Sequence, residues 1–367
     1  MRVFLATGEA SGDMLAAALA TGIRDLVPAA QFEGIGGERM AAAGVKLSAS
    51  TAGWGAMGPL EALRTIPQLL LTLFWNALRL LASPRDLIVL VDFGAGNLRL
   101  GRFLRRFGYR RPILYFLPPG AWLDIAPQAR DVARNAMPLT AFAHQRDFYR
   151  SLSLEVAYFG HPLVSLVQPR AERLPPAADG GTIALLPGSR RAEIARHMPR
   201  LLQACRLLRE RRPRATFVVS AADRDAENSI RRQLAGCAES FPIVRGARAA
   251  IDVADAAWIA SGTAVLEAVL REVPCVALYV IAPAQVPIAK RMWRGPYATL
   301  PNILLEREVV PELLQDDATP ERLADALENV LAGPTAQLAA ARAVRTRLGE
   351  PDALQRCAAF AITLARS

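Results

Sequence analysis

The sequence predicts an α/β protein made of two halves, in each of which parallel strands alternate with helices. Three stretches share one order, a short apolar strand, a turn of small residues and a helix; they begin at Val3, Thr182 and Ala256. This is the order of a βα unit, whose strands pair in parallel with their neighbours. The two halves show no tandem repeat, and a segment rich in Pro and Gly separates them. We therefore predict a first domain at 1–168, a linker at 169–181, a second domain at 182–348 and a C-terminal segment at 349–367.

The composition is that of a globular protein that can bury large cores. Of the 367 residues, 52% are hydrophobic and 21% are charged. The net charge of +10 is carried almost wholly by arginine, because the only lysines are Lys46 and Lys290. Arginine suits phosphate and acidic lipid surfaces, although scarce lysine can equally reflect genome composition. No basic run with interleaved aromatics and no zinc finger is visible, so we expect no nucleic-acid partner.

The cysteines and histidines predict neither a disulfide nor a metal site. The four cysteines lie far apart without a C-x-x-C pair, and Cys205 and Cys275 stand in apolar runs, as buried free thiols of a cytoplasmic protein do. The three histidines, His144, His161 and His197, are equally scattered. The N-terminus lacks the apolar region of a signal peptide, so we expect a cytoplasmic protein.

The first strand, at 3–6, runs into the turn T-G-E-A-S-G-D, and a helix follows. In an open parallel sheet this turn lies at the carboxyl end of its strand, where ligands bind. Its spacing fits neither a dinucleotide fingerprint nor a P-loop. Ser11 and Asp13 are also suited to capping the helix, whereas Glu9 has no capping duty and is the better ligand contact. A glycine turn at 34–37 follows the next strand, which begins at Gln31.

Residues 60–82 form the most apolar stretch of the chain. Asn76 and Arg79 interrupt it, and it falls short of the roughly 20 apolar residues that cross a bilayer. Two interpretations remain: a buried core helix, apolar around much of its circumference, or an interfacial helix flanked by arginines. In the second interpretation the membrane contacts are Leu71, Phe74 and Trp75.

A continuous apolar strand at 86–91 ends in Asp92. A carboxylate just beyond the carboxyl end of a central strand faces the ligand crevice, so Asp92 is the best general-base candidate of the first half. Its alternative role is to cap the following helix. Further strands of this half are predicted at 113–117, 141–143 and 156–159.

The second half opens with a strand at 182–186, the turn P-G-S at 187–189 and a helix marked by Ile194, Met198 and Leu201. Unpaired N–H groups and the helix dipole favour an anion at such a turn. Arg190 and Arg191 stand there, where arginine is unfavourable for the helix itself, so we expect an outside anion, most simply a phosphate. The alternative is a βα turn with surface arginines.

A second turn of this kind, S-G-T at 261–263, follows the strand at 256–260. Ser261 and Thr263 can offer hydroxyl and N–H groups to a phosphate, or cap the helix, and Glu267 can accept from ribose hydroxyls. Two such turns favour a nucleotide diphosphate, and both should open on the same edge of the sheet. Further strands are predicted at 216–220, 242–245 and 275–280.

Taken in order, these segments resemble the lipid-A-disaccharide synthase family over nearly the whole chain. The matching motifs are G-E-A-S-G-D at 8–13, M-G-x-x-E at 57–61, the strand ending in Asp92 with Asn97 after it, G-H at 160–161, L-L-P-G-S-R-x-x-E-I at 185–194, S-G-T-A-x-L-E at 261–267, L-P-N-x-L at 300–304 and E-L-L-Q at 312–315.

The resemblance implies a GT-B glycosyltransferase: two Rossmann-like, doubly wound domains facing across a cleft, with the last helix, at 349–367, packing back on the first domain. The family transfers 2,3-diacylglucosamine, with inversion, from its UDP donor to the 6-hydroxyl of 2,3-diacylglucosamine 1-phosphate, giving the β-1,6 lipid A disaccharide 1-phosphate and UDP. It uses no cofactor or metal. It is peripheral on the cytoplasmic face of the inner membrane, and a homodimer built by exchange of C-terminal segments is implied.

The same resemblance assigns roles to individual residues. Asp92 is the catalytic base, and Arg190 binds the leaving diphosphate, which needs electrostatic stabilisation. The donor-binding residues are Gly188, Ser189, Arg190, Glu193, Ser261, Gly262, Thr263, Glu267 and Asn302. The acceptor-binding residues are Glu9, Ser11, Gly12, Asp13, Met57, Glu61, Asn97 and Trp122.

Two loops of the first half depart from the family's pattern. The family usually has D-A-P-D-F-N after the catalytic strand, whereas residues 92–97 read D-F-G-A-G-N; its P-S-V-W-A-W is replaced by P-G-A-W-L-D at 119–124. The donor is therefore better indicated than the acceptor. The alternatives are a different membrane glycolipid acceptor and a catalytically silent nucleotide-sugar-binding protein. A non-hydrolysing sugar epimerase, which also uses two such domains and UDP-sugars, fits the order of motifs less well.

Overall fold

The computed structural model describes residues 1–51, 54, 59–120, 125–170, 179–237, 239–292 and 295–367. The chain divides into two compact units, Met1–Leu166 with Leu348–Ser367, and Val167–Arg347. The first unit thus ends at Leu166 rather than at 168. Gly180 and Gly181, expected in a linker, already belong to a strand of the second unit.

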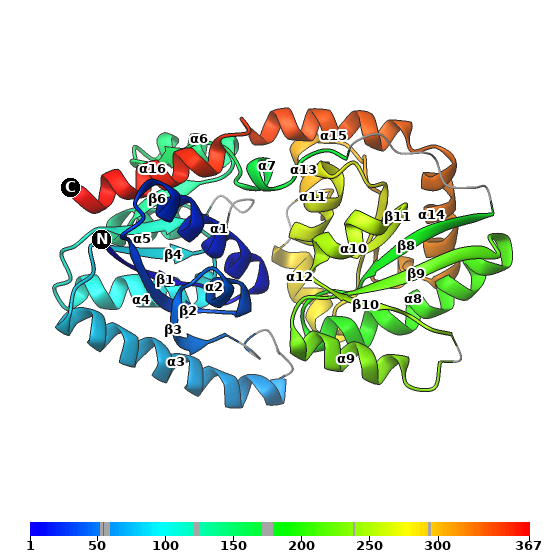
Figure 1. The fold of residues 1–367 in the computed structure, drawn as a ribbon, viewed down its shortest axis with the longest axis horizontal. Helices are drawn as coiled ribbons and strands as arrows, with labels where there is room; N and C mark the ends of the chain where they lie inside the picture. The colour runs from blue at the N-terminus through cyan, green and yellow to red at the C-terminus, as the bar shows by residue number, and fades with distance from the viewer. Residues whose placement is uncertain (52–53, 55–58, 121–124, 171–178, 238, 293–294) are drawn as a thin grey trace. The chain divides into compact units, whose positions relative to one another are not determined.

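Among the described residues, the first unit holds a seven-stranded parallel sheet in the order β3-β2-β1-β4-β5-β6-β7 (Figure 1). The order reverses between β1 and β4, so the segments that follow these two strands meet where doubly wound sheets bind ligands. The strands are β1 (Arg2–Ala6), β2 (Gln31–Gly36), β3 (Lys46–Ser50), β4 (Leu87–Val91), β5 (Ile113–Phe116), β6 (Met137–Thr140) and β7 (Ala157–Tyr158).

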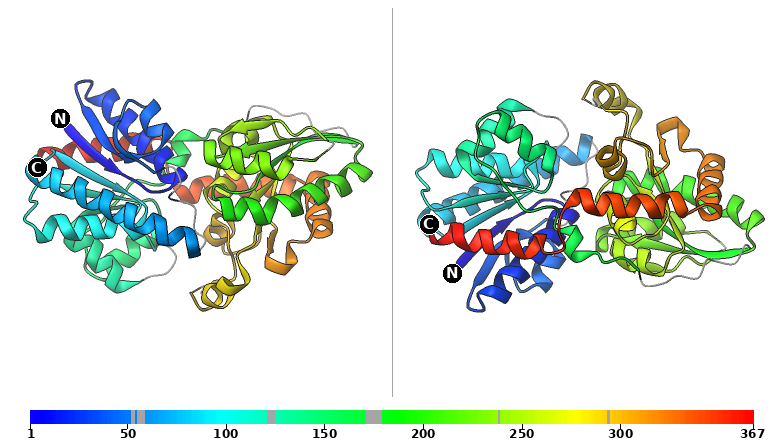
Figure 2. Two further views of the ribbon diagram at one scale, coloured as in Figure 1. Left: turned by 90° about the horizontal axis from the view of Figure 1, so that it is seen from below. Right: turned by 90° about the horizontal axis from the view of Figure 1, so that it is seen from above.

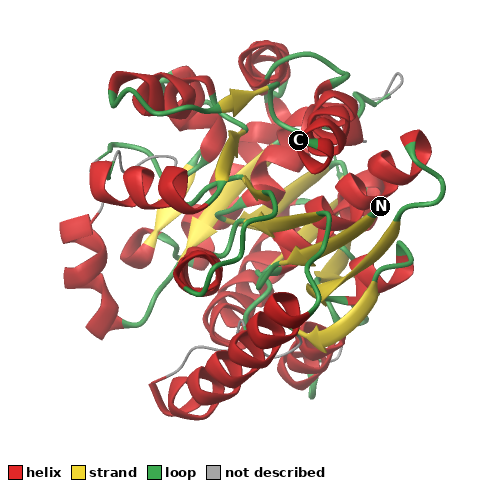
Figure 3. Cartoon of the chain, turned by 90° about the vertical axis from the view of Figure 1, so that its left-hand side faces the viewer, coloured by secondary structure: helices red, strands yellow, loops and turns green. Residues whose placement is uncertain are grey.

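Helices cover both faces of this sheet (Figure 3). Because side chains alternate along a strand, Phe4, Ile88 and Leu90 pack with α3 and α4 on one face, while their sequence neighbours face α1. The helices are α1 (Ala10–Leu26), α2 (Glu38–Ala42), α3 (Pro59–Ala82), α4 (Gly94–Arg106), α5 (Ala126–Asn135), α6 (Ala143–Ser151), α7 (Leu163–Leu166) and α16 (Ala353–Arg366).

The C-terminal helix α16 packs against α1, far from it in sequence (Figures 1 and 2). Gly22 of α1 permits this approach, since an added Cβ would lie 3.3 Å from the Cβ of Ala358. The chain returns to the first unit beside the point where it leaves: the N–H of His161 donates to the carbonyl of Leu348 at 2.7 Å, and the hydroxyl of Ser165 accepts from the N–H of Leu354 at 3.0 Å.

The second unit repeats the design with the strand order β10-β9-β8-β11-β12-β13, again parallel and reversing between β8 and β11. Its core holds the fully buried Trp258, whose Nε1 donates to the carbonyl of Leu323 at 2.9 Å. The strands are β8 (Gly180–Leu186), β9 (Arg214–Ala221), β10 (Ile243–Arg245), β11 (Ala256–Ala260), β12 (Cys275–Tyr279) and β13 (Glu312–Leu314). The helices are α8 (Arg191–Arg211), α9 (Arg224–Leu234), α10 (Ala247–Val253), α11 (Thr263–Leu270), η1 (Pro283–Gln285), α12 (Val286–Met292), α13 (Leu300–Leu305), η2 (Gln315–Asp317), α14 (Pro320–Ala332) and α15 (Thr335–Leu348).

The predicted fold class, two Rossmann-like parallel α/β domains, is confirmed, with local corrections. The strand expected at 141–143 is β6 instead, where Pro138 hides its strand character. The glycine turn expected at 34–37 is wrong, because β2 continues to Gly36. Gly34 instead allows β2 to lie close to β1, since a Cβ on it would overlap the carbonyl of Leu5. The edge strands β3 and β13 were not predicted.

Candidate active site

Asp92 follows β4 at the reversal point of the first sheet, and its backbone is strained. Asp92 and Phe93 have φ values of 48° and 47°, a left-handed conformation that costs about 1–3 kcal/mol per non-glycine residue. Three hydrogen bonds hold it. The N–H of Asp92 donates to the carbonyl of Phe116 at 3.0 Å, and the carbonyl of Asp92 accepts from Nδ2 of Asn97 at 3.0 Å and from the hydroxyl of Tyr115 at 2.9 Å. The half-buried carboxylate of Asp92 therefore sits on a fixed backbone.

Asn97 is a positioning residue. Asn97 is only 1% exposed, and its Nδ2 also donates to the carbonyls of Ala6 and Val91, each at 3.0 Å. The amide thus joins the carboxyl ends of β1 and β4 to the loop at Asp92. These bonds give Asn97 a structural role, and its contact with the acceptor stays a prediction.

Asp13 has a structural role as well. Its buried carboxylate accepts from the N–H groups of Gly37, Arg39 and Met40 at 2.7, 2.9 and 3.2 Å, so it caps α2 from another helix. The predicted acceptor contact of Asp13 is therefore wrong, and so is its alternative role as a cap of its own helix.

The remaining residues of the first turn are placed as follows. Helix α1 begins at Ala10, so Ser11 lies inside its first turn and does not cap it. Glu9 occupies the N-cap position with extended backbone and no side-chain cap bond, and it stays the acceptor-binding candidate of this turn together with the half-buried Ser11. Gly12 is buried, and a Cβ on it would overlap the hydroxyl of Thr7, so it serves packing.

Phe93 is a site residue that sequence reasoning missed. Its ring lies over Gly8 and Gly96, because a Cβ on either glycine would overlap it, and it is 5.9 Å from the ring of Trp54. The loop that departs from the family's pattern is thus matched to its own surroundings. A phenylalanine set among glycines at 94 and 96 is the signal that the sequence offered. Met57 and Trp122 lie outside the described residues, as does the side chain of Glu61 on α3, so these three stay predictions.

In the second unit, the turns after β8 and β11 stand side by side. These strands are adjacent and parallel, with Leu185 opposite Trp258, so both turns open on the same edge, as predicted. Gly188 and Gly262 have φ values of 107° and 154°, which side chains other than glycine rarely adopt, so both turns require glycine. Gly262 is the N-cap of α11 and no side chain caps that helix; the hydroxyl of Ser261 instead donates to the carbonyl of Ala298 at 3.0 Å. The capping alternative for Ser261 and Thr263 is therefore wrong.

Arg190 stands at the N-cap of α8 and is held by Glu193. The carboxylate of Glu193 accepts from the N–H of Arg190 at 3.4 Å and from its guanidinium at 3.3 Å, and from the hydroxyl of Tyr279 at 3.3 Å. The Arg190 side chain remains 32% exposed, which leaves surface for a ligand. Arg191 instead faces Asp225 at 3.6 Å and is a surface residue, as the alternative interpretation of the two arginines would have it.

His197 lies beneath this turn and was missed as a site residue. It is fully buried; the N–H of Val280 donates to its Nε2 at 3.0 Å, so Nδ1 carries the proton and donates to the carbonyl of Pro187 at 2.7 Å. Burial lowers the pKa of His197, which favours this neutral form. The ring ties the ends of β8 and β12 together. The sequence could have indicated this role of His197, because the residue lies two helical turns after Arg190 on the same face of α8.

Asn302 is also wrongly predicted as a ligand contact. It is fully buried; Nδ2 donates to the carbonyl of Val310 at 2.8 Å and to Glu312 at 2.7 Å, and Oδ1 accepts from the N–H groups of Val309 and Val310. Every hydrogen-bonding position of the amide is therefore occupied by the protein itself.

Glu312 connects Asn302 to the turn at Ser261. Its carboxylate accepts from the N–H groups of Ala298 and Thr299 at 2.7 and 2.8 Å and from the hydroxyl of Thr299 at 2.7 Å. Since Ser261 donates to Ala298, the L-P-N and E-L-L-Q motifs form one network that supports this turn. Glu267, one turn into α11, is buried and stays a predicted ribose contact.

Comparison with known proteins decides the family. The model of the family described as lipid-A-disaccharide synthetase matches residues 3–357. The chain belongs to this family. It is therefore a hexosyltransferase of lipid A biosynthesis, as the resemblance implied. It is 35% identical over 374 residues to the lipid-A-disaccharide synthase of Myxococcus xanthus, covering 99% of this chain and 97% of the relative. It is 38% identical over 341 residues to that of Aromatoleum aromaticum, covering 90% and 87%.

Solved structures agree on the fold. A UDP-GlcNAc 2-epimerase from Neisseria meningitidis, bound to UDP-GlcNAc, superposes with a TM-score of 0.64 at 10% identity, covering 99% of this chain and 100% of the other. A calicheamicin glycosyltransferase superposes with a TM-score of 0.54 at 13% identity, covering 99% and 97%. At these identities the likeness concerns the two-domain, Rossmann-like GT-B fold alone.

Helix α3 has a buried face and an exposed face, both of them apolar. Leu73, Ala77 and Leu80 are buried in the core, whereas Leu71 and Trp75 are 58% and 65% exposed and Phe74 is exposed beside them. The core interpretation therefore holds for one face of α3, whereas the other is an exposed apolar surface of the kind that marks interaction sites, and its contact with a membrane stays a prediction. No helix in the described part of the chain is long and apolar enough to cross a membrane.

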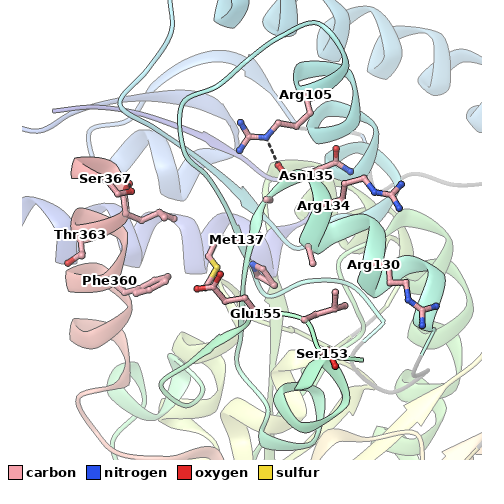
Figure 4. Close-up of a pocket in the computed structure, with 15 residues that line it drawn as sticks. Arg105, Arg130, Arg134, Asn135, Met137, Ser153, Glu155, Phe360, Thr363 and Ser367 are labelled. Carbon is pink, nitrogen blue, oxygen red and sulfur yellow. Dashed lines mark hydrogen bonds between the residues drawn. The ribbon is translucent and has the colours of Figure 1, made fainter. Parts of the chain in front are cut away.

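A cavity of about 780 Å³ lies at the opposite, amino-terminal end of the first sheet, between α5 and α16. Phe360 points toward Met137 and Glu155, whereas the guanidinium groups of Arg130 and Arg134 point away from them (Figure 4). Its charged groups do not converge on one point, and Asp92 stands at the other end of the sheet. This cavity is therefore not part of the synthase site.

The cysteines of this protein are free thiols. All four cysteines are free, with Cys237 partly exposed and the other three buried. Burial raises the pKa of Cys275 and of Cys357 to about 12 each, so these thiols stay protonated. In the ranges that the structure describes, no three His, Cys, Asp or Glu side chains gather closely enough to hold a metal ion.

Proposed function

We propose that this chain transfers 2,3-diacylglucosamine from UDP to the 6-hydroxyl of 2,3-diacylglucosamine 1-phosphate, with Asp92 as the general base. The carboxylate of Asp92 takes the hydroxyl proton while the hydroxyl oxygen attacks the anomeric carbon. The bond to UDP breaks on the opposite face, its electrons leave with the diphosphate, and the configuration inverts to β. The observation that carries this proposal is the strained backbone of Asp92, which Asn97 and Tyr115 hold at the reversal point of the sheet.

On the donor side, the diphosphate of UDP binds across the turns after β8 and β11. The N–H groups at the starts of α8 and α11 and the guanidinium of Arg190 stabilise the charge that develops on the leaving UDP. Gly188, Ser189, Gly262 and Thr263 contribute backbone to this site, while Glu193 and the Ser261 hydroxyl keep it in shape. Glu267 accepts from the ribose. The shared edge of β8 and β11 supports this arrangement.

The base assignment is tested with Asp92→Asn. We expect normal folding and UDP binding, and a loss of transfer of about 10²- to 10⁴-fold, the usual contribution of a general base. Mass spectrometry of the products formed from both acylated glucosamine substrates measures transfer. The matched control is Asp131→Asn, an acid that pairs with Arg102 on the surface. Full transfer by Asp92→Asn removes the assignment.

The donor site is tested with Arg190→Ala. We expect weaker binding of UDP and a higher KM for the UDP-sugar, because one cation of the diphosphate site is lost. Arg191→Ala is the control, since Arg191 is its sequence neighbour but pairs with Asp225. Equal UDP affinity of the two variants contradicts the role of Arg190. The reaction is also proposed to need no metal, so activity should survive treatment with EDTA.

Two other functions give different products in the same experiment. A different membrane glycolipid acceptor remains an alternative because the loops at 92–97 and 119–124 depart from the family's pattern. It is favoured if UDP is released only with another glycolipid present. UDP binding without any product favours a catalytically silent protein.

We further propose that the exposed face of α3 holds the protein on the cytoplasmic face of the inner membrane, through Leu71, Phe74 and Trp75. The double change Leu71→Ser and Trp75→Ser should weaken co-sedimentation with anionic liposomes. Leu26→Ser, which changes an exposed leucine on α1, should not. Unaltered binding of the double variant contradicts the proposal.

The family resemblance also supports a homodimer, formed by exchange of C-terminal segments that include α16. Light scattering of the full chain should give twice the mass of 39.7 kDa, and removal of α16 should abolish the dimer. A single-chain mass at micromolar concentration refutes it.

A further inference from the structure

An apolar groove runs between α3 and α4 on the first unit. It has a volume of about 600 Å³. Leu73, Ala77 and Leu100 are buried at its base, and the exposed Leu70 and Leu71 form one wall. Its lining is almost wholly hydrocarbon and has no carboxylate. Such a groove offers few hydrogen bonds to a sugar and suits an alkyl chain instead.

The groove lies along the helix that starts at the proposed base. Helix α4 begins at Gly94, two residues after Asp92, and contributes Leu100 and Phe103 to the lining. With a rise of 1.5 Å per residue, these side chains lie about 9–14 Å beyond the start of the helix. A fatty acyl chain attached to a sugar at Asp92 spans this distance when extended along α4. The groove therefore lies within reach of an acyl chain on a sugar bound at Asp92.

The charge at the rim fits an anionic amphiphile. Arg99 lines the groove, is exposed, and donates from its guanidinium to the carbonyl of Ala95 on its own helix. It has no carboxylate partner in the part of the chain that the structure describes. A cation beside a hydrocarbon groove suits a ligand that joins a phosphate to an acyl chain.

We infer that this groove binds one fatty acyl chain of the acceptor, acylated glucosamine 1-phosphate, and so directs its 6-hydroxyl to Asp92. This rests on the proposed function of the first unit. Leu70 and Ala77 of helix α3 then face the acyl chain. Leu71 and Phe74 line the groove and also belong to the exposed face proposed for the bilayer, whereas the exposed Trp75 lies outside the groove. The acceptor is held by its chain as well as by its sugar.

The test uses the full-length protein and water-soluble acceptor analogues with acyl chains of increasing length. They are kept below the concentration at which they aggregate, because a chain already in a micelle or bilayer gains little from a groove. Calorimetry measures binding without donor, and product formation measures transfer. We expect Kd to fall about fourfold per added methylene, the transfer free energy of one CH₂, until the groove is full.

Leu70→Trp places an indole in the groove from an exposed position, and we expect it to flatten this dependence while binding of the shortest acceptor is retained. The matched control is Leu78→Trp, an exposed leucine of α3 that does not line the groove; it should keep the full dependence. Arg99→Ala should lower the preference for the 1-phosphate over the dephosphorylated analogue.

Each outcome separates the two proposals. Equal chain-length dependence in Leu70→Trp and the unchanged protein, or no dependence in the unchanged protein, overturns the groove. A chain-length dependence that Leu70→Trp removes, without disaccharide from any acceptor, supports the groove and overturns the proposed transfer.

Discussion

Replacing Asn97 by Ala separates a positioning role from a binding role. The side chain is buried and donates to the carbonyls of Ala6, Val91 and Asp92. At about 1 kcal/mol for each lost hydrogen bond, Asn97→Ala should cost roughly 2–3 kcal/mol of stability. For a unit of this size that lowers the Tm by about 5–10 °C.

The same change should lower kcat more than it raises the KM for the acceptor. Without Asn97, the left-handed backbone of Asp92 loses one of its three restraints and relaxes, so the base leaves its place while the acceptor surface stays intact. Thermal unfolding and steady-state kinetics measure the two effects. Asn135→Ala is the control, since Nδ2 of Asn135 donates to the carbonyl and the carboxylate of Asp131 within the same helix, α5. An unchanged Tm with a raised acceptor KM would refute the reasoning and favour Asn97 as a ligand contact.

Three further predictions concern packing, pH and thiol reactivity. Gly8→Ala should leave the protein folded but reduce transfer, because its Cβ would displace the ring of Phe93 beside the base; unchanged kinetics would show that the ring has room to move. His161 is protonated below about pH 6.5 in the unfolded chain, whereas burial lowers the pKa of the folded residue to about 3. The free energy of unfolding is therefore unaffected by this residue above pH 6.5 and falls as the pH drops from 6.5 toward 3. Denaturant titrations should show a slope of up to about 1.4 kcal/mol per pH unit from this residue, which His161→Asn reduces, and an identical slope in that variant contradicts it. A thiol reagent should label one cysteine of the native protein, Cys237, and all four after unfolding; rapid native labelling of Cys205, Cys275 or Cys357 would contradict their burial.

The sequence predicted the turns of the site better than the roles of its polar residues. A strand, a small-residue turn and a helix are local patterns, so the turns after β8 and β11 and the position of Asp92 could be inferred. Asn97 and Asn302 look like ligand contacts within a motif, whereas the fold gives both of them structural hydrogen bonds. Asn97 bonds to Ala6, 91 positions earlier in the chain, and no local pattern reveals such a partner.

The missed residues have the same cause. His197 acts through Val280, which is 83 positions away, and a single histidine in a helix has no pattern of its own. Glu312 and Asn302 belonged to two separate motifs, and only folding joins them. Asn302 and Glu312 support the site from within the fold, whereas the ligand roles of the half-buried Glu9 and Arg190 and of the buried Glu267 stay predictions.

The adjacency of residues 161–165 and 348–354 makes the second unit an insertion within the first. The chain departs after Leu166 and comes back at Leu348, where backbone and side-chain hydrogen bonds already join the two points. A short linker from 166 to 348 should therefore close the first unit into a single continuous domain. Each unit could then be produced alone, and its binding of ligands measured separately. Removal of the last helix would damage the first unit, which carries Asp92, rather than the second unit, which precedes that helix in the chain.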